Sequence, residues 1–273
     1  MRAALIQLCA SDDPAEGLEP LRDWIGEAAD GGAELICTPE VTNAVATSRA
    51  RRDEVLRTEE EDRTLALVRE EAARHGVWIA LGSLALKTGG ERLANRSFLI
   101  APDGRIAARY DKLHMFDVDV GEGESYRESS AYAPGDRAVI ARTPLGALGL
   151  TICYDLRFPH LFRDLAKAGA EVILVPSAFS PTTGPAHWEV LLRARGIECG
   201  AFVLAAAQSG AHRTEKPRRS HGHSLAVGPW GEVLSDAGEA LGVTFVDLDL
   251  TKVAEARRRL PSLTHDAPYE APA

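Results

Sequence analysis

The sequence lacks paired cysteines and long apolar runs. Its four cysteines lie far apart and form no Cys-X-X-Cys pair, which disfavours a disulfide scaffold or a zinc ribbon and fits a reducing compartment. No apolar stretch approaches the roughly 20 residues that a membrane-spanning helix needs. The apolar start at residues 1–8 is too short for a signal peptide and runs into Ser11-Asp12-Asp13. We therefore expect a cytoplasmic protein with no membrane partner.

An excess of positive charge is also missing. The formal net charge is −9, which argues against nucleic acid or an anionic membrane as the main partner. Hydrophobic residues make up 45% and charged residues 26% of the chain, a composition typical of a soluble globular enzyme. A chain of 273 residues can bury a full core, as one large domain or as two fused halves.

Short apolar runs alternate with amphipathic stretches, a pattern that predicts α/β layering. Strands are expected at residues 2–9, 33–38, 77–86, 96–101, 105–110, 138–142, 147–153, 171–176, 201–207, 223–228 and 243–249. Helices are expected at residues 15–30, 53–75, 158–168, 186–199 and 251–259. The turn sequence Pro102-Asp103-Gly104 predicts a hairpin between two of these strands.

The chain also contains an internal echo. Residues 22–39 and 163–176 each read as a helix, a Gly-Ala turn and a buried strand that ends at proline. This indicates two related βαβ halves, roughly 1–111 and 138–250, with the site at the strand ends where the halves meet. The alternative is that Gly-Ala-Glu before an aliphatic strand is only a common connection. Residues 112–137 would form a loop over the site.

Three polar residues stand where predicted strands end: Glu40, Lys112 and Cys153. A cysteine in this position is either a packed core residue or a nucleophile that opens toward solvent. A nucleophilic thiol needs a base because it is mostly protonated at neutral pH. No histidine stands in an evident strand-end motif, so Glu40 is the better candidate. Lys112 is either a surface charge or a holder of a developing oxyanion, with the backbone N–H after the nucleophile as second donor.

Two further motifs are weaker. Glu128 reads as loop surface by composition alone. His221 and His223 could suggest a metal pair, but a third ligand at plausible spacing is missing, and zinc normally takes three or four protein ligands. We therefore expect no metal.

Glu40, Lys112 and Cys153, with their flanks, resemble the catalytic triad of the nitrilase, or carbon–nitrogen hydrolase, superfamily. The resemblance covers essentially the whole chain, which implies a single carbon–nitrogen hydrolase domain over residues 1–273. Residues 176–198 are most similar to the deaminated glutathione amidase branch and its sister, the ω-amidases. The family fold is a four-layer αββα sandwich that commonly dimerises through its outer helices, so we expect this fold and a homo-oligomer.

The resemblance implies a role for each site residue. Glu40 would be the base, Lys112 and the backbone N–H of Tyr154 would bind the oxyanion, and Glu128 would hold Lys112 and the hydrolytic water. Cys153 would form a thioester, and no cofactor would be needed. By analogy with the branch, further residues of the substrate pocket are expected to be Asn43, Tyr154, Arg157, Ser177, Ala178, Phe179, Thr182 and Thr183.

The implied reaction is hydrolysis of a non-peptide-type C–N amide bond in a small molecule. The substrate expected first is deaminated glutathione, which would give 2-oxoglutarate and Cys-Gly, because residues 205–210 are nearer that branch. An ω-amidase acting on α-ketoglutaramate or related dicarboxylate monoamides is the alternative, since residues 116–120 are nearer that one. A catalytically silent binding or scaffold protein is the non-enzyme alternative. The cationic loop 212–219 is either a solvated face or a site for the glycine carboxylate of a peptide-like leaving group.

Overall fold

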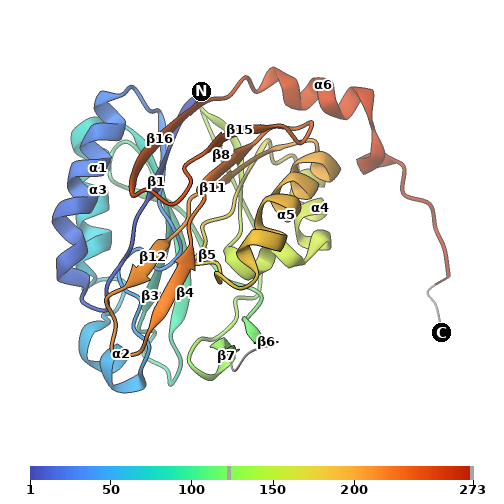
Figure 1. The fold of residues 1–273 in the computed structure, drawn as a ribbon. Helices are drawn as coiled ribbons and strands as arrows, with labels where there is room; N and C mark the ends of the chain where they lie inside the picture. The colour runs from blue at the N-terminus through green and yellow to red at the C-terminus, as the bar shows by residue number, and fades with distance from the viewer. Residues whose placement is uncertain (122–123, 271–273) are drawn as a thin grey trace.

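The computed structural model describes residues 1–121 and 124–270; residues 122–123, inside the predicted loop 112–137, and 271–273, at the end of the predicted domain, lie outside this description. Two six-stranded sheets stack face to face. Helices α1 (Leu18–Asp30) and α3 (Arg63–His75) cover one outer face, and α4 (Pro159–Lys167) and α5 (Gly184–Cys199) cover the other (Figure 1). The molecule therefore has the predicted αββα layers.

The first sheet has the strand order β16-β1-β2-β3-β4-β5. Its strands are β1 (Arg2–Gln7), β2 (Leu35–Cys37), β3 (Trp78–Leu86), β4 (Ala94–Ile100), β5 (Ile106–Asp111) and β16 (Gly242–Asp247). The central strands β1, β2 and β3 are parallel, and β16, β4 and β5 are antiparallel to their neighbours. The hairpin predicted around Pro102-Asp103-Gly104 is the β4–β5 connection.

The second sheet repeats this pattern in the order β8-β9-β10-β11-β14-β15. Its strands are β8 (Val139–Thr143), β9 (Gly146–Leu150), β10 (Val172–Leu174), β11 (Phe202–Ala205), β14 (Leu225–Val227) and β15 (Val233–Asp236). Here β9, β10 and β11 are parallel, and the remaining strands are antiparallel to their neighbours. Equal directions in equal positions support two related halves, but β16 lies within the predicted second half, 138–250, and joins the sheet of the first half by pairing with β1.

The core follows from strand geometry. Successive side chains of a strand point to opposite faces of its sheet. In β1, Ala3 and Leu5 therefore pack toward the second sheet, while Ala4 and Ile6 pack toward α1 and α3. All four are 0% exposed, which explains why β1 reads as a continuous apolar run. Fully burying one such Leu or Ile contributes about 1.5–3 kcal/mol.

Two predicted segments differ from the structure. The helix expected at 53–75 is interrupted: α2 (Arg49–Val55) ends at an extended Leu56, and α3 begins after Asp62, whose side chain accepts from the N–H of Leu65 as an N-cap. Residues 112–137 are not only loop. They contain β6 (Asp117–Gly121), β7 (Glu124–Arg127) and the short 3-10 helix η2 (Glu128–Ser130).

The structure adds a second small strand pair, β12 (Ser209–His212) and β13 (Arg218–His221), which were not predicted because their sequences are polar. Strand β15 was also missed. Helix α6 (Thr251–Arg259) lies where predicted. Further short 3-10 helices are η1 (Pro14–Gly17), η3 (Cys153–Arg157) and η4 (Ser262–Thr264). Among the described helices, none combines the length and apolarity that crossing a membrane requires.

Candidate active site

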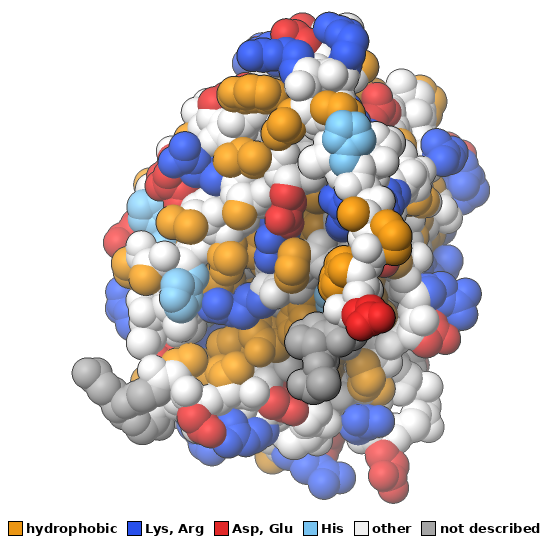
Figure 2. Space-filling model, turned by 90° about the vertical axis from the view of Figure 1, so that its right-hand side faces the viewer, with side chains coloured by type: hydrophobic (Ala, Val, Ile, Leu, Met, Phe, Trp, Pro, Cys, Tyr) orange, Lys and Arg blue, Asp and Glu red, His pale blue; other side chains and the backbone are white. Residues whose placement is uncertain are grey.

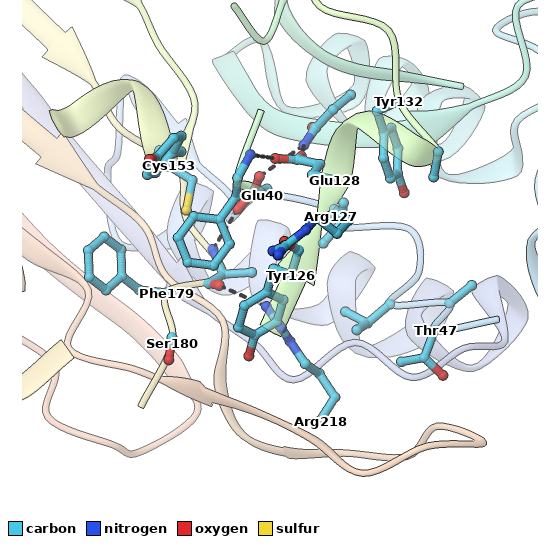
Figure 3. Close-up of a pocket in the computed structure, with 18 of the residues that line it drawn as sticks. Glu40, Thr47, Tyr126, Arg127, Glu128, Tyr132, Cys153, Phe179, Ser180 and Arg218 are labelled. Atoms are coloured by element: carbon cyan, nitrogen blue, oxygen red, sulfur yellow. Dashed lines mark hydrogen bonds between the residues drawn. The ribbon is translucent and has the colours of Figure 1, made fainter. Parts of the chain in front are cut away.

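Three chain segments that follow strands converge between the two sheets. Glu40 comes three residues after β2, and Lys112 directly follows β5, both in the first sheet. Cys153 comes three residues after β9 in the second sheet. The Cys153 side chain and the Glu40 carboxylate lie at the same end of one cavity (Figure 3). The predicted convergence of carboxylate, ammonium and thiol at the meeting of the halves is therefore seen in the structure.

Cys153 occupies a sharp turn from β9 into η3. Its φ is 47°, in the left-handed region that costs a non-glycine residue roughly 1–2 kcal/mol. The backbone N–H of Cys153 donates to the carbonyl of Pro176 at 2.9 Å, which fixes the turn against the neighbouring strand end. The next residue, Tyr154, lies in the first turn of η3, where backbone N–H groups have no acceptor within their own helix. Its N–H is therefore suited to bind an oxyanion.

Asp155 fixes this turn relative to the segment that carries Lys112. Its carboxylate is 0% exposed and accepts from the backbone N–H of Ile152 at 2.9 Å and the hydroxyl of Tyr110 at 2.6 Å. It also binds His114, with its backbone N–H at 3.1 Å and its Nδ1 at 2.7 Å. Tyr110 and His114 stand two residues on either side of Lys112. One buried carboxylate thus connects the turn that carries Cys153 with the segment that carries Lys112.

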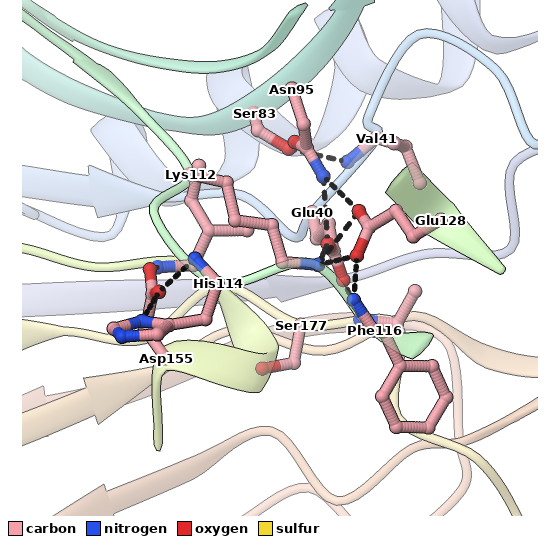
Figure 4. A network of polar contacts seen from close by, with 12 residues as sticks. Glu40, Val41, Ser83, Asn95, Lys112, His114, Phe116, Glu128, Asp155 and Ser177 are labelled. Carbon is pink, nitrogen blue, oxygen red and sulfur yellow. Dashed lines mark hydrogen bonds and ion pairs between the residues drawn. The ribbon is translucent and has the colours of Figure 1, made fainter. Parts of the chain in front are cut away.

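Lys112 is buried between two carboxylates (Figure 4). Its Nζ donates to Oε1 of Glu40 at 2.8 Å and to both oxygens of Glu128, at 2.9 and 2.8 Å. Asn95 Nδ2 donates to the same Glu40 oxygen at 2.9 Å. The other Glu40 oxygen accepts the backbone N–H of Ala178 at 2.9 Å. These contacts orient the Glu40 carboxylate and leave Lys112 charged.

The ionisation states follow from this arrangement. Burial alone would raise the pKa of the Glu40 carboxyl, but Lys112 and the Ala178 N–H hold that pKa below its ordinary value. Burial would lower the pKa of Lys112, but Glu128 and Glu40 hold it well above its ordinary value. Burial, and after it the charge of Glu40, raises the pKa of the Cys153 thiol. A neutral thiol therefore lies beside an ionised carboxylate, which can accept its proton.

The cavity in front of this cluster has a volume of about 620 Å³. Five of the residues predicted for the substrate pocket line it: Tyr154, Arg157, Ala178, Phe179 and Thr183. The Arg157 guanidinium lies 5.4 Å from the centre of the Phe179 ring. An arginine held against an aromatic ring in a cavity is suited to bind a carboxylate.

Three predicted pocket residues lie outside the lining of this cavity. Asn43 is buried and donates from Nδ2 to Asp62 and to the carbonyl of Ala85, both at 3.0 Å. The hydroxyl of Ser177 donates to the Val175 carbonyl at 3.1 Å. Thr182 donates to Glu124. These side chains support the walls of the cavity and do not face its interior.

Other lining residues were not identified from the sequence. Asn95 stands immediately before a predicted strand, and its position at a strand end was the available signal. Tyr126 and Arg218 come from β7 and β13, whose polar sequences gave no strand signal. Both side chains point into the cavity (Figure 3).

The histidine pair has another explanation than a metal site. His223 Nδ1 lies 3.0 Å from Asp236, and the rings of His221 and His223 stack at 4.7 Å. Within residues 1–121 and 124–270, no group of three or more His, Cys, Asp or Glu side chains is arranged to hold a metal ion.

Comparisons with known proteins identify the family of this chain. The carbon-nitrogen hydrolase family model matches residues 2–258. The deaminated glutathione amidase of Yersinia enterocolitica is 41% identical over 267 residues, which cover 96% of this chain and 92% of the relative. The human protein of that name is 36% identical over 272 residues, covering 97% and 82%.

Comparison with solved structures indicates the same family. The Caenorhabditis elegans NitFhit protein matches with a TM-score of 0.90 and 34% identity; 97% of this chain is covered, and this chain spans 64% of that one. A mutant amidase from Nesterenkonia sp. AN1, with acrylamide added at its active-site cysteine, matches with a TM-score of 0.79 and 28% identity, covering 96% and 98%. This chain belongs to the carbon-nitrogen hydrolase family.

Proposed function

We propose that this protein is an amidase in which Glu40, Lys112 and Cys153 form the catalytic triad and Cys153 carries a thioester intermediate. The contact that supports this proposal most directly is Lys112 Nζ held at 2.8 Å from both Glu40 and Glu128, beside a thiol whose base would be Glu40. Family membership supplies the reaction class, which is hydrolysis of an amide C–N bond.

The chemistry follows from these positions. Glu40 takes the proton of the Cys153 thiol, and the thiolate attacks the amide carbonyl. Lys112 Nζ and the N–H of Tyr154 stabilise the oxyanion of the tetrahedral intermediate. The C–N bond then breaks, and Glu40 returns the proton to the departing amine, which leaves an acyl thioester on Cys153.

Water completes the cycle. Glu40 removes a proton from a water molecule, which is oriented between Glu40 and Glu128, and the water oxygen attacks the thioester carbonyl. Collapse of the second tetrahedral intermediate breaks the C–S bond and frees the carboxylic acid. The proton held by Glu40 returns to the Cys153 sulfur, so the enzyme is restored.

For the substrate we propose deaminated glutathione, which would be cleaved to 2-oxoglutarate and Cys-Gly. Relatives of this name match over nearly the whole chain. Arg157 lies four residues after Cys153 in the same cavity and would bind the carboxylate of the 2-oxoglutaryl unit as a bidentate partner. The substrate α-ketoglutaramate has the same acyl unit and is the compound to compare.

The test combines kinetics with mass spectrometry. We expect a higher kcat/KM for deaminated glutathione than for α-ketoglutaramate, and a 2-oxoglutaryl adduct on Cys153 when turnover is quenched with acid. Cys153→Ala should give neither product nor adduct. Cys199→Ala is the matched control, because Cys199 is buried in the core away from the cavity. Turnover without an adduct on Cys153, or with an adduct elsewhere, would refute the mechanism.

The remaining expectations are proposals of the same kind. Residues 1–273 would act as one hydrolase domain in the cytoplasm, where a reducing environment suits four cysteines that form no disulfide in the described part of the chain. The chain would self-associate through the face of α5, where Val190 is 65% and Ile197 46% exposed. That side of the molecule shows hydrophobic side chains among charged ones (Figure 2).

A further inference from the structure

The cavity contains more positive charge than the proposed acyl site uses. Besides Lys112 and Arg157, it is lined by Arg52, Arg127, Lys216 and Arg218. Arg127 is neutralised by Asp119, at 2.8 Å. Over residues 1–121 and 124–270, no carboxylate forms an ion pair with Arg52, Arg157, Lys216 or Arg218. In a protein with a net charge of −9, a cavity with unpaired cations favours an anionic ligand.

Arg218 is the best placed of the outer cations. Its guanidinium lies 4.6 Å from the centre of the Tyr126 ring, and one nitrogen donates to the carbonyl of Ala178 at 3.4 Å. Stacking fixes the plane of the guanidinium. Because a guanidinium has five N–H donors in a fork that matches a carboxylate, most of them stay available for a ligand. Figure 3 shows this side chain extending into the cavity below Tyr126.

Glu124, a carboxylate in the lining of the same cavity, is bonded to hydroxyl groups instead. Glu124 accepts from the hydroxyl of Ser180 at 2.9 Å and from the hydroxyls of Thr182 and Tyr126. Burial alone would raise the pKa of Glu124, but these hydrogen bonds together hold the pKa below its ordinary value. The charge of Arg218 is the smallest of the effects that lower it. Glu124 therefore fixes the wall of the cavity around Arg218.

A series of aromatic rings separates Arg218 from the nucleophile turn. The rings of Tyr154 and Phe116 lie 5.0 Å apart, those of Phe116 and Tyr126 lie 4.9 Å apart, and Arg218 follows on Tyr126. Arg157 instead sits at the end of η3 against Phe179. Arg157 and Arg218 thus lie against different aromatic rings of the same cavity.

We propose that Arg218 binds a carboxylate on the amine side of the scissile amide, so that the substrate class is a dianionic amide whose leaving amine ends in a carboxylate. This rests on the proposed function. Arg218 donates to the carbonyl of Ala178, whose own N–H binds Glu40 at 2.9 Å. Two extended residues span at most about 7 Å, so a dipeptide amine is long enough to extend from the reacting carbonyl toward Arg218. A primary amide releases ammonia and has no group for Arg218. The subsite therefore selects carboxylate-terminated amides over primary amides.

The test compares two substrates and two variants. The substrates are deaminated glutathione and its C-terminal glycinamide form, which differ only in the terminal charge. Arg218→Gln should lower kcat/KM for the carboxylate form by roughly 10- to 100-fold, mainly through KM, because a charge-assisted hydrogen bond is lost. The wild type should have a low kcat/KM for the glycinamide form, and Arg218→Gln should lower that kcat/KM far less than the value for the carboxylate form.

Arg219→Gln is the matched control. Arg219 is the neighbouring residue on β13 but is exposed and lies outside this cavity, so its substitution should keep the ratio between the two substrates. Arg218→Lys, which keeps the charge and loses the fork, should fall between the wild type and Arg218→Gln. An equal loss on both substrates would mean that Arg218 only holds Tyr126, and no loss would mean that the carboxylate lies elsewhere; either result overturns the subsite.

The outcome separates this inference from the proposed function. Wild-type turnover of α-ketoglutaramate with an adduct on Cys153, but no preference for the terminal carboxylate, would refute the subsite alone. Absence of turnover and of an adduct with all three amides would refute the proposed function and the subsite with it. Melting temperatures of all variants within a few degrees of the wild type would show that the comparison concerns binding and not folding.

Discussion

Glu40 shows how a buried carboxylate is held ionised in one orientation. One oxygen accepts from Lys112 and Asn95, and the other accepts the backbone N–H of Ala178. Its backbone carbonyl accepts from Gln208 at 3.0 Å. These contacts limit the rotation of the carboxylate, and it stays ionised despite its burial.

The pH dependence of activity tests this state. Because the pKa of Glu40 is below its ordinary value, the acid limb of kcat/KM should have its midpoint below about pH 4.3, the usual glutamate pKa. A lowered pKa also stabilises the folded state above the unfolded pKa, and this stabilisation is lost as pH falls through the folded pKa. Rates and melting temperatures measured from pH 3 to 9 give both quantities. An acid limb centred near pH 6 would contradict an ionised Glu40.

At this scale the sequence predicted the residues that stand at strand ends. Glu40, Lys112 and Cys153 could be identified because an apolar run stops just before each of them. Glu128 could not, because its role depends on η2 bringing it within 2.8 Å of Lys112, and only the family resemblance indicated it. Tyr126 and Arg218 were missed because their contact joins segments about ninety residues apart, and no local pattern encodes such a contact.

Among the elements, the β6–β7 strand pair forms part of the cavity wall. It pairs in register from Asp117 opposite Arg127 to Val118 opposite Tyr126. Glu124 joins it to the segment before α5 through Ser180 and Thr182. The sequence predicted a loop here because these short strands are half-exposed and polar, and their pairing is stabilised by side-chain contacts more than by burial.

Removing the Glu124 side chain should make the β6–β7 strand pair more mobile. For Glu124→Ala we expect faster amide hydrogen exchange in β6 and β7 and a KM raised several-fold, because three hydroxyl donors lose their acceptor and each such bond contributes about 1 kcal/mol. Exchange in the β4–β5 hairpin should not change. Glu60→Ala, at an exposed glutamate, is the control. Unchanged exchange at β6 and β7 would show that Glu124 does not hold them.

Helix α5 was predicted closely, for a reason that the structure makes clear. Its buried stripe includes Trp188 at 1% and Leu192 at 0% exposure. Arg195 on the same stripe binds Glu198 at 2.7 Å and the carbonyl of Leu156, as expected for an internally satisfied charge. A helix of 16 residues without an internal break can be located from the sequence even though the apolar Val190 and Ile197 lie on its exposed side. The break between α2 and α3, in contrast, depended on the single cap at Asp62.

Viewed whole, the molecule consists of two halves with matching strand directions that share one interior. The cluster between the sheets combines Leu5 and Leu35 of the first half with Leu150 and Val172 of the second. Sequence periodicity predicted the layers, and the echo predicted the duplication. Neither the periodicity nor the echo predicted how the halves face each other, because that arrangement is decided by side chains distant in the chain.

Self-association belongs to this scale. We expect Val190→Glu to halve the molecular mass measured by light scattering after gel filtration, because a charge would be placed on the exposed apolar face of α5. Leu241→Glu, at a residue that is 50% exposed and outside α5, should keep the wild-type mass. A wild-type protein that runs as a monomer, or a Val190→Glu variant that keeps the full mass, would exclude this face as the interface.

Two glutamines form hydrogen bonds between the halves beside the site. Gln7, in β1, donates to the carbonyls of Gly238 and Ala240 and accepts the N–H of Ser224. Gln208, beyond β11, binds Ala10 and Glu40. These hydrogen bonds hold the two halves in a fixed relative position. A substrate must therefore fit the cavity as the two sheets hold it, so the fixed size and shape of this cavity restrict which amides can enter.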